Sequence, residues 1–437
     1  MNKSKKGLEL WGRAKKVIPG GNMLLSKRSE MFLPERWPSY FDKSRGCTVW
    51  DLDGNSYVDM SIMGIGTNSL GYGHKDVDKA VMEVVQKGNM STFNCLEEVL
   101  LAEKLLELHP WADMVRLART GGEANAIAIR IARAASGRDG VAICGYHGWH
   151  DWYLSANIRN NNQLSDHLLP GLSPNGVPNN LGGTVFPFRY NNTDEFMKVI
   201  TENDIGVVKM EVCRNERPAP GFLEFIRDET KKRGIVLIFD ECTSGFRETY
   251  GGLHLKYGVN PDMAVFGKAL GNGYAITAVI GSKNIMEAAQ STFISSTFWS
   301  ERIGPAAGIA TLDVMKKLKS WEINSETGER IKELWKLISI ENKVPIKVSG
   351  LSSIPSFSFD SPNHLALKTF LTQEMLKKGY LATPLIFVCT KHEELIVKRY
   401  GQVLNDVFRE ISHLHEFEQI VSRLDGPVCH DGFKRLN

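Results

Sequence analysis

Short apolar runs that stop abruptly at polar or glycine residues recur along the middle of the chain. Two of them, Ile235–Phe239 and Met263–Phe266, end directly before Asp240 and before Gly267-Lys268. Runs of this length and composition are typical of strands that helices cover on both faces. Because ligands of open α/β sheets bind beyond the carboxyl ends of the strands, we predict that Asp240 and Lys268 share one crevice.

The same pattern predicts further strands, and apolar residues at helical spacing predict helices between them. The additional strands are Met114–Ala118, Gly140–Cys144, Thr184–Phe188, Ile205–Met210 and Ala278–Gly281. The predicted helices cover residues 7–17, 75–86, 99–108, 123–135, 222–232, 312–318 and 328–340. Near the start, the dipeptide Asp53-Gly54 predicts the turn of a hairpin. Strands that alternate with helices indicate an α/β fold with a mostly parallel sheet.

The length of the chain and a change of pattern predict more than one domain. The 437 residues exceed the roughly 250–300 residues that one hydrophobic core usually spans. From about residue 310 the sequence becomes more helical and more charged. We therefore expect a large domain at 66–309 and a smaller C-terminal domain at 310–437. The N-terminal segment 1–65 is expected to pack against the small domain or against a partner subunit.

Composition excludes several classes of protein. The net charge is +3 with dispersed Lys and Arg residues, so no nucleic acid partner is expected. The seven cysteines form no CxxC pair, which is typical of a reduced, cytoplasmic protein. No apolar run reaches the roughly 18 residues that a membrane span needs, and no secretory signal follows the basic start. His147 and His150 have no third ligand at suitable spacing, so no metal is expected.

One segment carries a pattern that suits an anion. Arg119-Thr120-Gly121-Gly122 joins a predicted strand to a predicted helix. A turn of small residues at the start of a helix presents free backbone N–H groups and the positive end of the helix dipole, which together bind phosphate. An ordinary strand-to-helix turn is the more frequent meaning of a single Gly-Gly. The absence of GxxxxGK[ST] argues against a nucleotide P-loop.

Other strand ends also carry candidate chemistry. Tyr146 follows the strand Gly140–Cys144 and can stack on a planar ring, and Glu211 follows the strand Ile205–Met210. Residues 155–183 are rich in Asn, Gly, Pro and Ser and show no periodicity. A loop of this length without regular structure is often functional, for example as an active-site lid, although an insertion without consequence is the alternative.

Asp240 and Lys268 permit two interpretations. They can form a partly buried ion pair, which is the more frequent arrangement for two such residues alone. They can also form a pyridoxal phosphate (PLP) site, in which lysine binds the aldehyde and aspartate holds a proton on the pyridine nitrogen. The remaining motifs of the chain favour the second interpretation.

Those motifs occur in an order that is similar to a known family. They are Ile18–Gly21, Val49–Gly54, Leu70–His74, Thr120–Ala124, Gly145–Gly148, Phe239–Glu241, Gly245–Arg247, Gly267-Lys268 and Ser295–Thr297. The chain resembles the class III, fold-type I PLP-dependent aminotransferases. Within that class it resembles the glutamate-1-semialdehyde 2,1-aminomutase group and its aminotransferase-like relatives. The resemblance implies a large domain with a mostly parallel seven-stranded sheet and a smaller α+β C-terminal domain.

The resemblance also implies PLP as the cofactor and roles for individual residues. Lys268 would form the Schiff base and carry the proton, and Asp240 would pair with the pyridine nitrogen. The other implied contacts are Gly121 and Gly122 to the phosphate, Tyr146 on one ring face, Cys242 near the other, and Glu211 near the ring hydroxyl. Thr297 would reach the phosphate of the neighbouring subunit, which implies a homodimer with a shared active site. The 155–183 loop matches the gating loop of the aminomutases.

Two stretches depart from the aminomutase pattern. The arginine that holds the substrate carboxylate in that group falls near Lys27 or Arg28, in a stretch that is one residue longer here. Where the group carries an acidic active-site residue, this chain has Thr383–Phe387. The segment Thr297–Arg302 adds bulk beside the phosphate. These departures disfavour glutamate-1-semialdehyde as the substrate. The stretch Met23–Arg28 resembles that of relatives associated with bacterial surface-glycan biosynthesis, and this resemblance implies a sugar-derived or otherwise hydroxylated carbonyl compound.

The resemblance leaves three functional hypotheses. The first is an aminotransferase that moves an amino group from a donor such as glutamate to a keto or aldehyde acceptor. The second is an intramolecular glutamate-1-semialdehyde 2,1-aminomutase. The third is a non-catalytic scaffold that kept the fold, which the presence of both Asp240 and Lys268 disfavours.

Overall fold

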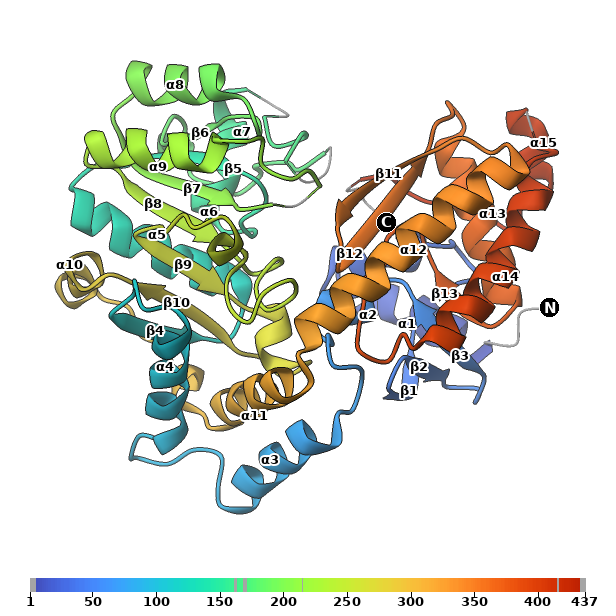
Figure 1. Cartoon of the computed structure of the whole chain (residues 1–437), viewed down its shortest axis with the longest axis horizontal. Helices are drawn as coiled ribbons and strands as arrows, with labels where there is room; N and C mark the ends of the chain where they lie inside the picture. Colours follow the sequence, from blue (N-terminus) through green and yellow to red (C-terminus); the bar gives the residue numbers. More distant parts are fainter. Residues whose placement is uncertain (1–4, 161–162, 168–170, 214, 415, 433–437) are drawn as a thin grey trace. The chain divides into compact units, whose positions relative to one another are not determined.

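The computed structural model describes residues 5–160, 163–167, 171–213, 215–414 and 416–432 (Figure 1). The chain forms two compact units. One comprises Lys75–Glu322, and the other comprises Met1–His74 together with Ile323–Asn437. The compact units therefore divide after His74 and after Glu322, whereas the sequence analysis placed domain borders after residues 65 and 309.

A seven-stranded sheet forms the centre of the unit Lys75–Glu322. Its strand order is β4-β10-β9-β8-β7-β5-β6, and all neighbours are parallel except β10, which runs antiparallel to β4 and β9. The strands are β4 (Met114–Ala118), β5 (Gly140–Cys144), β6 (Val185–Pro187), β7 (Ile205–Glu211), β8 (Val236–Asp240), β9 (Met263–Phe266) and β10 (Thr277–Gly281). The predicted mostly parallel sheet is confirmed.

Helices cover both faces of this sheet. The helices of the unit are α3 (Lys75–Gln86), α4 (Leu96–Leu108), α5 (Gly121–Ser136), α6 (Asp151–Leu154), α7 (Ala156–Arg159), α8 (Thr193–Glu202), α9 (Phe222–Lys232), α10 (Lys283–Met286) and α11 (Ile303–Leu318). Helix α5 packs across β4, β7, β8, β9 and β10, and Figure 1 shows α8 and α9 in front of the sheet. The 3-10 turns are η3 (Asn179–Leu181), η4 (Leu253–Lys256), η5 (Lys268–Gly271), η6 (Glu287–Ser291) and η7 (Thr297–Ser300).

Helix α5 spans Gly121–Ser136, so it begins two residues before and ends one residue after the predicted helix 123–135, and local signals fix both ends. Thr120 caps the start: its hydroxyl accepts from the N–H of Glu123, and the Glu123 carboxylate accepts from the N–H of Thr120 at 2.9 Å. Gly137 ends the helix with a φ of 65°, which only a residue without a Cβ adopts readily. The alanine- and isoleucine-rich face between these ends packs against Ile143, Ile238 and Val265 of the sheet.

The second unit joins the two ends of the chain in one four-stranded sheet of order β1-β2-β3-β13. Strand β13 (Tyr380–Ala382) lies parallel to β3 (Ser56–Met60). The other strands are β1 (Phe41–Arg45), β2 (Thr48–Asp51), β11 (Ile346–Leu351) and β12 (Ile354–Phe359). The helices and turns are α1 (Lys5–Val17), η1 (Leu25–Lys27), η2 (Ser29–Met31), α2 (Met63–Gly66), α13 (His364–Lys377), α14 (Glu394–Ile411) and α15 (Phe417–Ser422), with α12 (Ser320–Asn342) beginning in the first unit.

Large aromatic residues dominate the core of the second unit. Trp335, Phe370 and Phe408 are fully buried and pack with residues of α13 and α14. The Trp335 indole N–H donates to the hydroxyl of Tyr400 at 3.1 Å, which satisfies both buried polar groups. Within the ranges described above, no helix is long and apolar enough to cross a lipid bilayer.

Residues 161–162 and 168–170 of the 155–183 segment lie outside the described residues. In the described part the expectation of no regular structure was wrong at α7 (Ala156–Arg159) and at the 3-10 turn η3 (Asn179–Leu181). The buried side chain of Asn157 explains the order. Its oxygen accepts from the N–H of Leu164 at 3.0 Å, and its amide donates to the carbonyl of Leu172 at 2.7 Å. One side chain therefore holds together two turns of the segment.

Candidate active site

Asp240 ends the buried strand β8 and is itself buried. Its Oδ2 atom lies 2.9 Å from Nδ1 of His147 and 3.6 Å from Nζ of Lys209. Its Oδ1 atom accepts from the backbone N–H of Cys242 at 3.1 Å. In the part of the chain that the structure describes, these three groups are the polar partners of Asp240, so the alternative ion pair with Lys268 is not formed.

The environment of Asp240 keeps its carboxyl group ionised. Burial alone would raise its pKa, but the positive charge of Lys209 and the hydrogen bond from His147 outweigh burial and hold the pKa well below its ordinary value. Burial lowers the pKa of His147, so the imidazole is neutral and its Nδ1–H donates to the carboxylate. The site therefore presents a fixed negative charge at the carboxyl end of a central strand.

Lys268 begins the turn η5 directly after β9. Its backbone φ is 44°, in the left-handed region that costs a residue with a Cβ about 1 kcal/mol or more. Such strain is concentrated at functional sites. Its Nζ atom donates to the hydroxyl of Thr243 at 2.6 Å. Lys268 is half-buried, so its amine has a fixed direction and stays accessible.

Cys242 connects Asp240 with the other strand ends. Its N–H binds Asp240, and a Cβ placed on Gly121 or on Gly267 would lie 3.8 Å or 3.5 Å from its sulfur. Burial raises the pKa of the Cys242 thiol well above its ordinary value, and the charge of Asp240 raises it further. The neutral thiol thus lies between the start of α5 and the residue that precedes Lys268.

The start of α5 is closed by the turn that follows β5. Gly148 has a φ of 107°, and a Cβ there would lie 3.2 Å from the Cα of Gly122. A Cβ on Gly122 would lie 2.9 Å from the ring of His150. Only residues without a side chain let the turn and the start of α5 come this close. The backbone N–H groups at the positive end of α5 therefore lie beside the turn. The capping box uses the N–H groups of Thr120 and Glu123 and leaves those of Gly121 and Gly122 for another partner.

Tyr146 and Glu211 lie together at the same edge. The N–H of Tyr146 donates to Oε2 of Glu211 at 3.1 Å, and the ring of Tyr146 meets Tyr153 edge-on with centroids 6.0 Å apart. Because His147 follows Tyr146 and binds Asp240, these contacts bring Gly121, Gly122, Tyr146, Glu211, Asp240 and Cys242 into one cluster.

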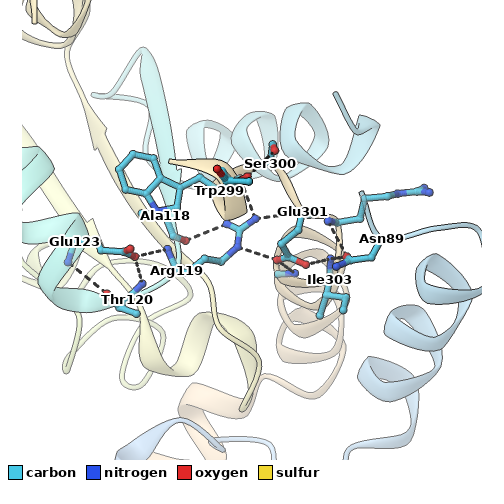
Figure 2. A network of polar contacts seen from close by, with 12 residues as sticks. Asn89, Ala118, Arg119, Thr120, Glu123, Trp299, Ser300, Glu301 and Ile303 are labelled. Atoms are coloured by element: carbon cyan, nitrogen blue, oxygen red, sulfur yellow. Dashed lines mark hydrogen bonds and ion pairs between the residues drawn. The ribbon is translucent and has the colours of Figure 1, made fainter. Parts of the chain in front are cut away.

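Arg119 anchors the segment that carries Thr297 through contacts with Trp299 and Glu301 (Figure 2). The Arg119 guanidinium donates to the carbonyls of Trp299 at 2.9 Å and Glu301 at 2.8 Å. Its Nε atom lies 2.8 Å from the Glu301 carboxylate, which also accepts from the N–H groups of Ile303 and Gly304 at the start of α11. The Thr297 side chain is exposed, and no contact between it and the cluster is found among the described residues.

Comparison with known proteins identifies the family. The sequence profile of "Aminotransferase class-III" matches residues 34–398. The chain belongs to this family. It is 30% identical over 405 residues to the 3-aminobutyryl-CoA aminotransferase of Cloacimonas acidaminovorans, covering 89% of this chain and 93% of that protein. It is also 30% identical over 433 residues to the glutamate-1-semialdehyde 2,1-aminomutase of Methanocaldococcus jannaschii. This match covers 93% of this chain and 98% of that protein.

Solved structures share the fold of this class-III aminotransferase. The FumI protein of Sphingopyxis sp. MTA144, in its PLP internal aldimine form, has a TM-score of 0.84 at 24% identity and covers 95% of this chain and 99% of that one. An omega-transaminase of Sphaerobacter thermophilus has a TM-score of 0.80 at 24% identity, and the match covers 93% of this chain and 98% of that one. The fold is therefore the fold-type I transaminase fold, as predicted, and PLP is the cofactor that the family and these structures indicate.

The residues at the site fit PLP. The ionised, buried carboxylate of Asp240 suits a protonated pyridine nitrogen, and the accessible amine of Lys268 suits an aldehyde. The start of α5, where Gly122 packs closely against Gly148, carries no side chain at residues 121 and 122 and has the backbone N–H groups that suit a phosphate. In the described ranges, no group of three metal-ligating side chains lies together.

Three residues of the class-III aminotransferase site were missed in the sequence analysis. His147 was considered only as a metal ligand, and Lys209 and Thr243 were not considered. A signal for Lys209 existed, because it is a charged residue inside the apolar run Ile205–Met210. His147 and Thr243 carried no such signal, since their partners Asp240 and Lys268 are 93 and 25 positions away.

Lys27 and Arg28 lie in the other compact unit. Lys27 is exposed at the end of η1. The Arg28 guanidinium packs over Gly20: a Cβ on Gly20 would lie 2.2 Å from it. Their assignment to substrate binding stays a prediction.

We expect Arg119→Ala to destabilise the aminotransferase by about 3 kcal/mol, because it leaves the mostly buried Glu301 carboxylate without its cation. The measurement is the free energy of unfolding of the compact unit Lys75–Glu322, which contains the seven-stranded sheet. The double variant with Glu301→Gln, whose side-chain oxygen still accepts at the start of α11, should recover most of the loss. Equal stability of the native protein and Arg119→Ala would contradict the ion pair.

A buried histidine network holds the loop that carries Thr243. Glu241 accepts from His254 Nδ1 at 2.9 Å and from the hydroxyl of Ser244. His109 accepts from the N–H of Gly252 at 2.9 Å and donates to the carbonyl of Leu105 at 2.8 Å. The loop after β8 is therefore tied at both of its ends.

This network predicts a pH dependence of stability. Burial lowers the pKa of His109 from 6.5 to about 4. Between these pH values the unfolded chain binds a proton that the folded chain does not, so stability falls by up to about 3 kcal/mol as the pH falls from about 6.5 to about 4. His109→Gln should flatten this part of the curve of melting temperature against pH. An unchanged slope in His109→Gln would show that His109 stays protonated in the folded protein.

Proposed function

We propose that the chain is a PLP-dependent aminotransferase that moves an amino group from glutamate to a keto or aldehyde acceptor. The observation that carries the proposal is Asp240: a buried carboxylate, held ionised by His147 and Lys209, lies in a cluster with the helix start at Gly121. Lys268 follows the neighbouring strand with an accessible amine. Membership of the class-III family and its cofactor support the same reaction type.

Each residue has a proposed task. The bound cofactor supplies an electron sink for the bonds at the substrate carbon. Asp240 holds a proton on the pyridine nitrogen, and His147 fixes the direction of its carboxylate. The Lys268 amine takes the proton from the substrate carbon and returns it, with Thr243 orienting Nζ. The N–H groups of Gly121 and Gly122 bind the phosphate.

The side chains around the ring position it and exclude water. Tyr146 would cover one face of the ring, and the neutral Cys242 thiol would lie toward the other. Glu211, whose carboxylate accepts from the N–H of Tyr146, would lie near the ring hydroxyl. Because the Cys242 thiol stays protonated, it adds no charge beside the ring.

A half-reaction tests this proposal. Protein loaded with PLP is mixed with L-glutamate, and the cofactor absorption and 2-oxoglutarate are followed together. One equivalent of 2-oxoglutarate per site, together with loss of the PLP band, supports an aminotransferase with a glutamate donor. PLP binding without amino exchange for any donor would instead support the scaffold hypothesis.

The second candidate function is an intramolecular aminomutase. The 30% identity to the aminomutase of M. jannaschii over 93% of this chain favours it. Conversion of glutamate-1-semialdehyde to 5-aminolevulinate without a second substrate would establish this activity. The departures at Lys27, Arg28 and Thr383–Phe387 argue against this second function. The likeness of Met23–Arg28 to relatives of surface-glycan biosynthesis supports instead a hydroxylated or sugar-derived acceptor, and a panel of such carbonyl compounds, offered after the glutamate half-reaction, tests that choice.

We also propose a homodimer with a shared active site. Exposed apolar side chains occur in the segment that carries Thr297 and in segments that share depressions with it: Phe93, Leu96, Val99, Trp149, Phe293 and Phe298. These depressions have volumes of about 760, 450 and 270 Å³, and adjoining ones share Ile294, Trp299 or Ser300 as lining residues. Apolar surface of this kind marks protein interfaces. A second copy docked here would bring its Thr297 to the start of α5.

We expect Phe93→Asp to convert the dimer to monomers and to weaken PLP binding, because it buries a charge in the proposed interface. Phe93 is 86% exposed in the single chain. Ile340→Asp is the matched control, since Ile340 is 75% exposed on α12 and should leave the dimer intact. Sedimentation gives the mass of each variant. A Phe93→Asp protein that remains dimeric would place the interface elsewhere.

A further inference from the structure

Lys209 is a charged residue in the interior of the central sheet. It lies on β7, paired with Ile143 of β5 on one side and Ile238 of β8 on the other. Its side chain is completely buried, with 0% exposure. An unpaired ammonium group in such a place costs several kcal/mol, so lysine is almost never fully buried without a partner. Packing alone does not explain the residue, because an apolar side chain would fill the same space.

The partner of Lys209 is the carboxylate that the cofactor also needs. Nζ lies 3.6 Å from Oδ2 of Asp240, and His147 holds the same oxygen. In the described ranges Nζ makes no hydrogen bond. The titratable groups that act on Lys209 are Asp240 on β8, His147 after β5, Cys242 after β8 and Glu211 two residues along β7. Asp240 is its one ion-pair partner among them.

Two cations therefore depend on one carboxylate when the cofactor is bound. Burial lowers the pKa of the Lys209 ammonium group, and the negative charge of Asp240 opposes this. A protonated pyridine nitrogen at Asp240 would share the carboxylate with the Lys209 ammonium group, and the two cations would repel each other. At an effective dielectric constant of about 20, two unit charges on opposite sides of one carboxylate would repel by a few kcal/mol, which shifts a proton equilibrium by roughly two pH units. Lys209 and Asp240 are both buried, so water screens this repulsion little.

We propose that Lys209 is a positioning residue for the cofactor that acts through Asp240. Its ammonium group competes with the pyridine nitrogen for the carboxylate and so sets how firmly that nitrogen holds its proton. Without cofactor, Lys209 balances the buried charge of Asp240. With cofactor, it weakens the protonation of the ring and tunes its strength as an electron sink. The inference rests on the proposed function, in which Asp240 meets the pyridine nitrogen.

Lys209→Met tests the inference, because methionine has a similar length and no charge. The enzyme is loaded with PLP that carries ¹⁵N in the ring, and the ring-nitrogen resonance is followed against pH. We expect the variant to keep the protonated-ring signal to a pH at least about one unit higher than the native protein does. We also expect a larger rise in melting temperature on PLP binding, since the protonated ring replaces the missing charge.

Three further variants separate charge from packing. Lys209→Gln is a second neutral variant and should behave like Lys209→Met. Val207→Ala removes packing from the same strand without a change of charge, so it should lower the melting temperature and leave the ¹⁵N titration unchanged. In an Asp240→Asn background the ring-nitrogen titration should move to lower pH whether residue 209 is lysine or methionine, because the carboxylate charge that holds the ring proton is gone.

The outcomes distinguish this inference from the proposed function. Native protein that gives no ¹⁵N signal of bound PLP would overturn the proposed function itself. Bound PLP whose titration is the same in the native protein, Lys209→Met and Lys209→Gln would overturn the role of Lys209 alone. A shift of equal size in Val207→Ala would assign the effect to loosened packing and would also overturn it.

Discussion

Lys268→Ala is expected to lower the rate of amino-group transfer by at least about 10³, because general base catalysis and covalent attachment of the cofactor both depend on this amine. The structure provides the reason for its position. Lys268 itself has a strained left-handed backbone conformation directly after β9. Its Nζ atom donates a hydrogen bond of 2.6 Å to the hydroxyl of Thr243, which fixes the direction of the amine. Alanine leaves the turn η5 and its packing in place, so the effect is chemical rather than structural.

Two measurements check this expectation. The half-reaction with L-glutamate gives the rate, and the absorption spectrum shows whether the cofactor is bound through a lysine. PLP should be removable from Lys268→Ala by dialysis. Lys283→Ala, a change of an exposed lysine at the start of α10, serves as the control and should keep native values. If Lys268→Ala had the native spectrum and rate, another lysine would have to bind the cofactor and move the proton.

Asp240→Ala is expected to have the second largest effect, a loss of about 10² or more in the half-reaction rate. Without the carboxylate, the pyridine nitrogen loses its proton and the ring becomes a weaker electron sink. The substitution also leaves the buried Lys209 without its counter-charge, which costs about 3–5 kcal/mol of stability. Both effects come from one side chain, so they have to be separated.

Lys209→Met in an Asp240→Asn background separates the two effects of Asp240, because it removes the uncompensated ammonium group and leaves only the effect on rate. Asp240→Asn alone removes the charge and keeps the volume of the side chain. Its amide oxygen can still accept from the N–H of Cys242, so the shape of the site is kept while the charge is lost. We expect a loss of rate close to that of the alanine variant together with a smaller loss of stability. Asp240→Glu keeps the charge and should retain more rate than Asp240→Asn. If Asp240→Asn were as fast as the native protein, the carboxylate charge would not be needed, and Asp240 would have a purely structural role.

Much of the sheet was predictable because its signals are local. The runs that became β4, β5, β8 and β9 are short, apolar and bounded by polar or glycine residues, and the structure places their ends within one residue of the prediction. Helix α3 has its predicted ends, since its apolar residues follow the helical period without interruption. In such segments the buried side chains and the backbone preference agree, so neighbours along the chain decide the structure.

Pairing between distant residues could not be predicted in the same way. Strand β13 joins β3 across more than 300 positions, and a three-residue strand carries too little pattern to reveal its partner. The contacts of Arg119 with Trp299 and Glu301 could not be predicted from the sequence for the same reason. A guanidinium group can bind many carbonyl and carboxylate groups, and only the fold determines which of them lie next to it. Loop segments such as Ala156–Arg159 were missed because a single side chain, Asn157, provides their order.

The sequence by itself determined the α/β class, the family resemblance and the cofactor, and it predicted Asp240 and Lys268 as site residues. These follow from local apolar patterns and from motifs whose order along the chain is visible without coordinates. Only the tertiary structure decided that Lys268 meets Thr243 and that Asp240 pairs with His147 and Lys209. The physical reason is that the ionisation of a buried group depends on charges within a few ångströms, and the fold brings those charges from strands far apart in the chain.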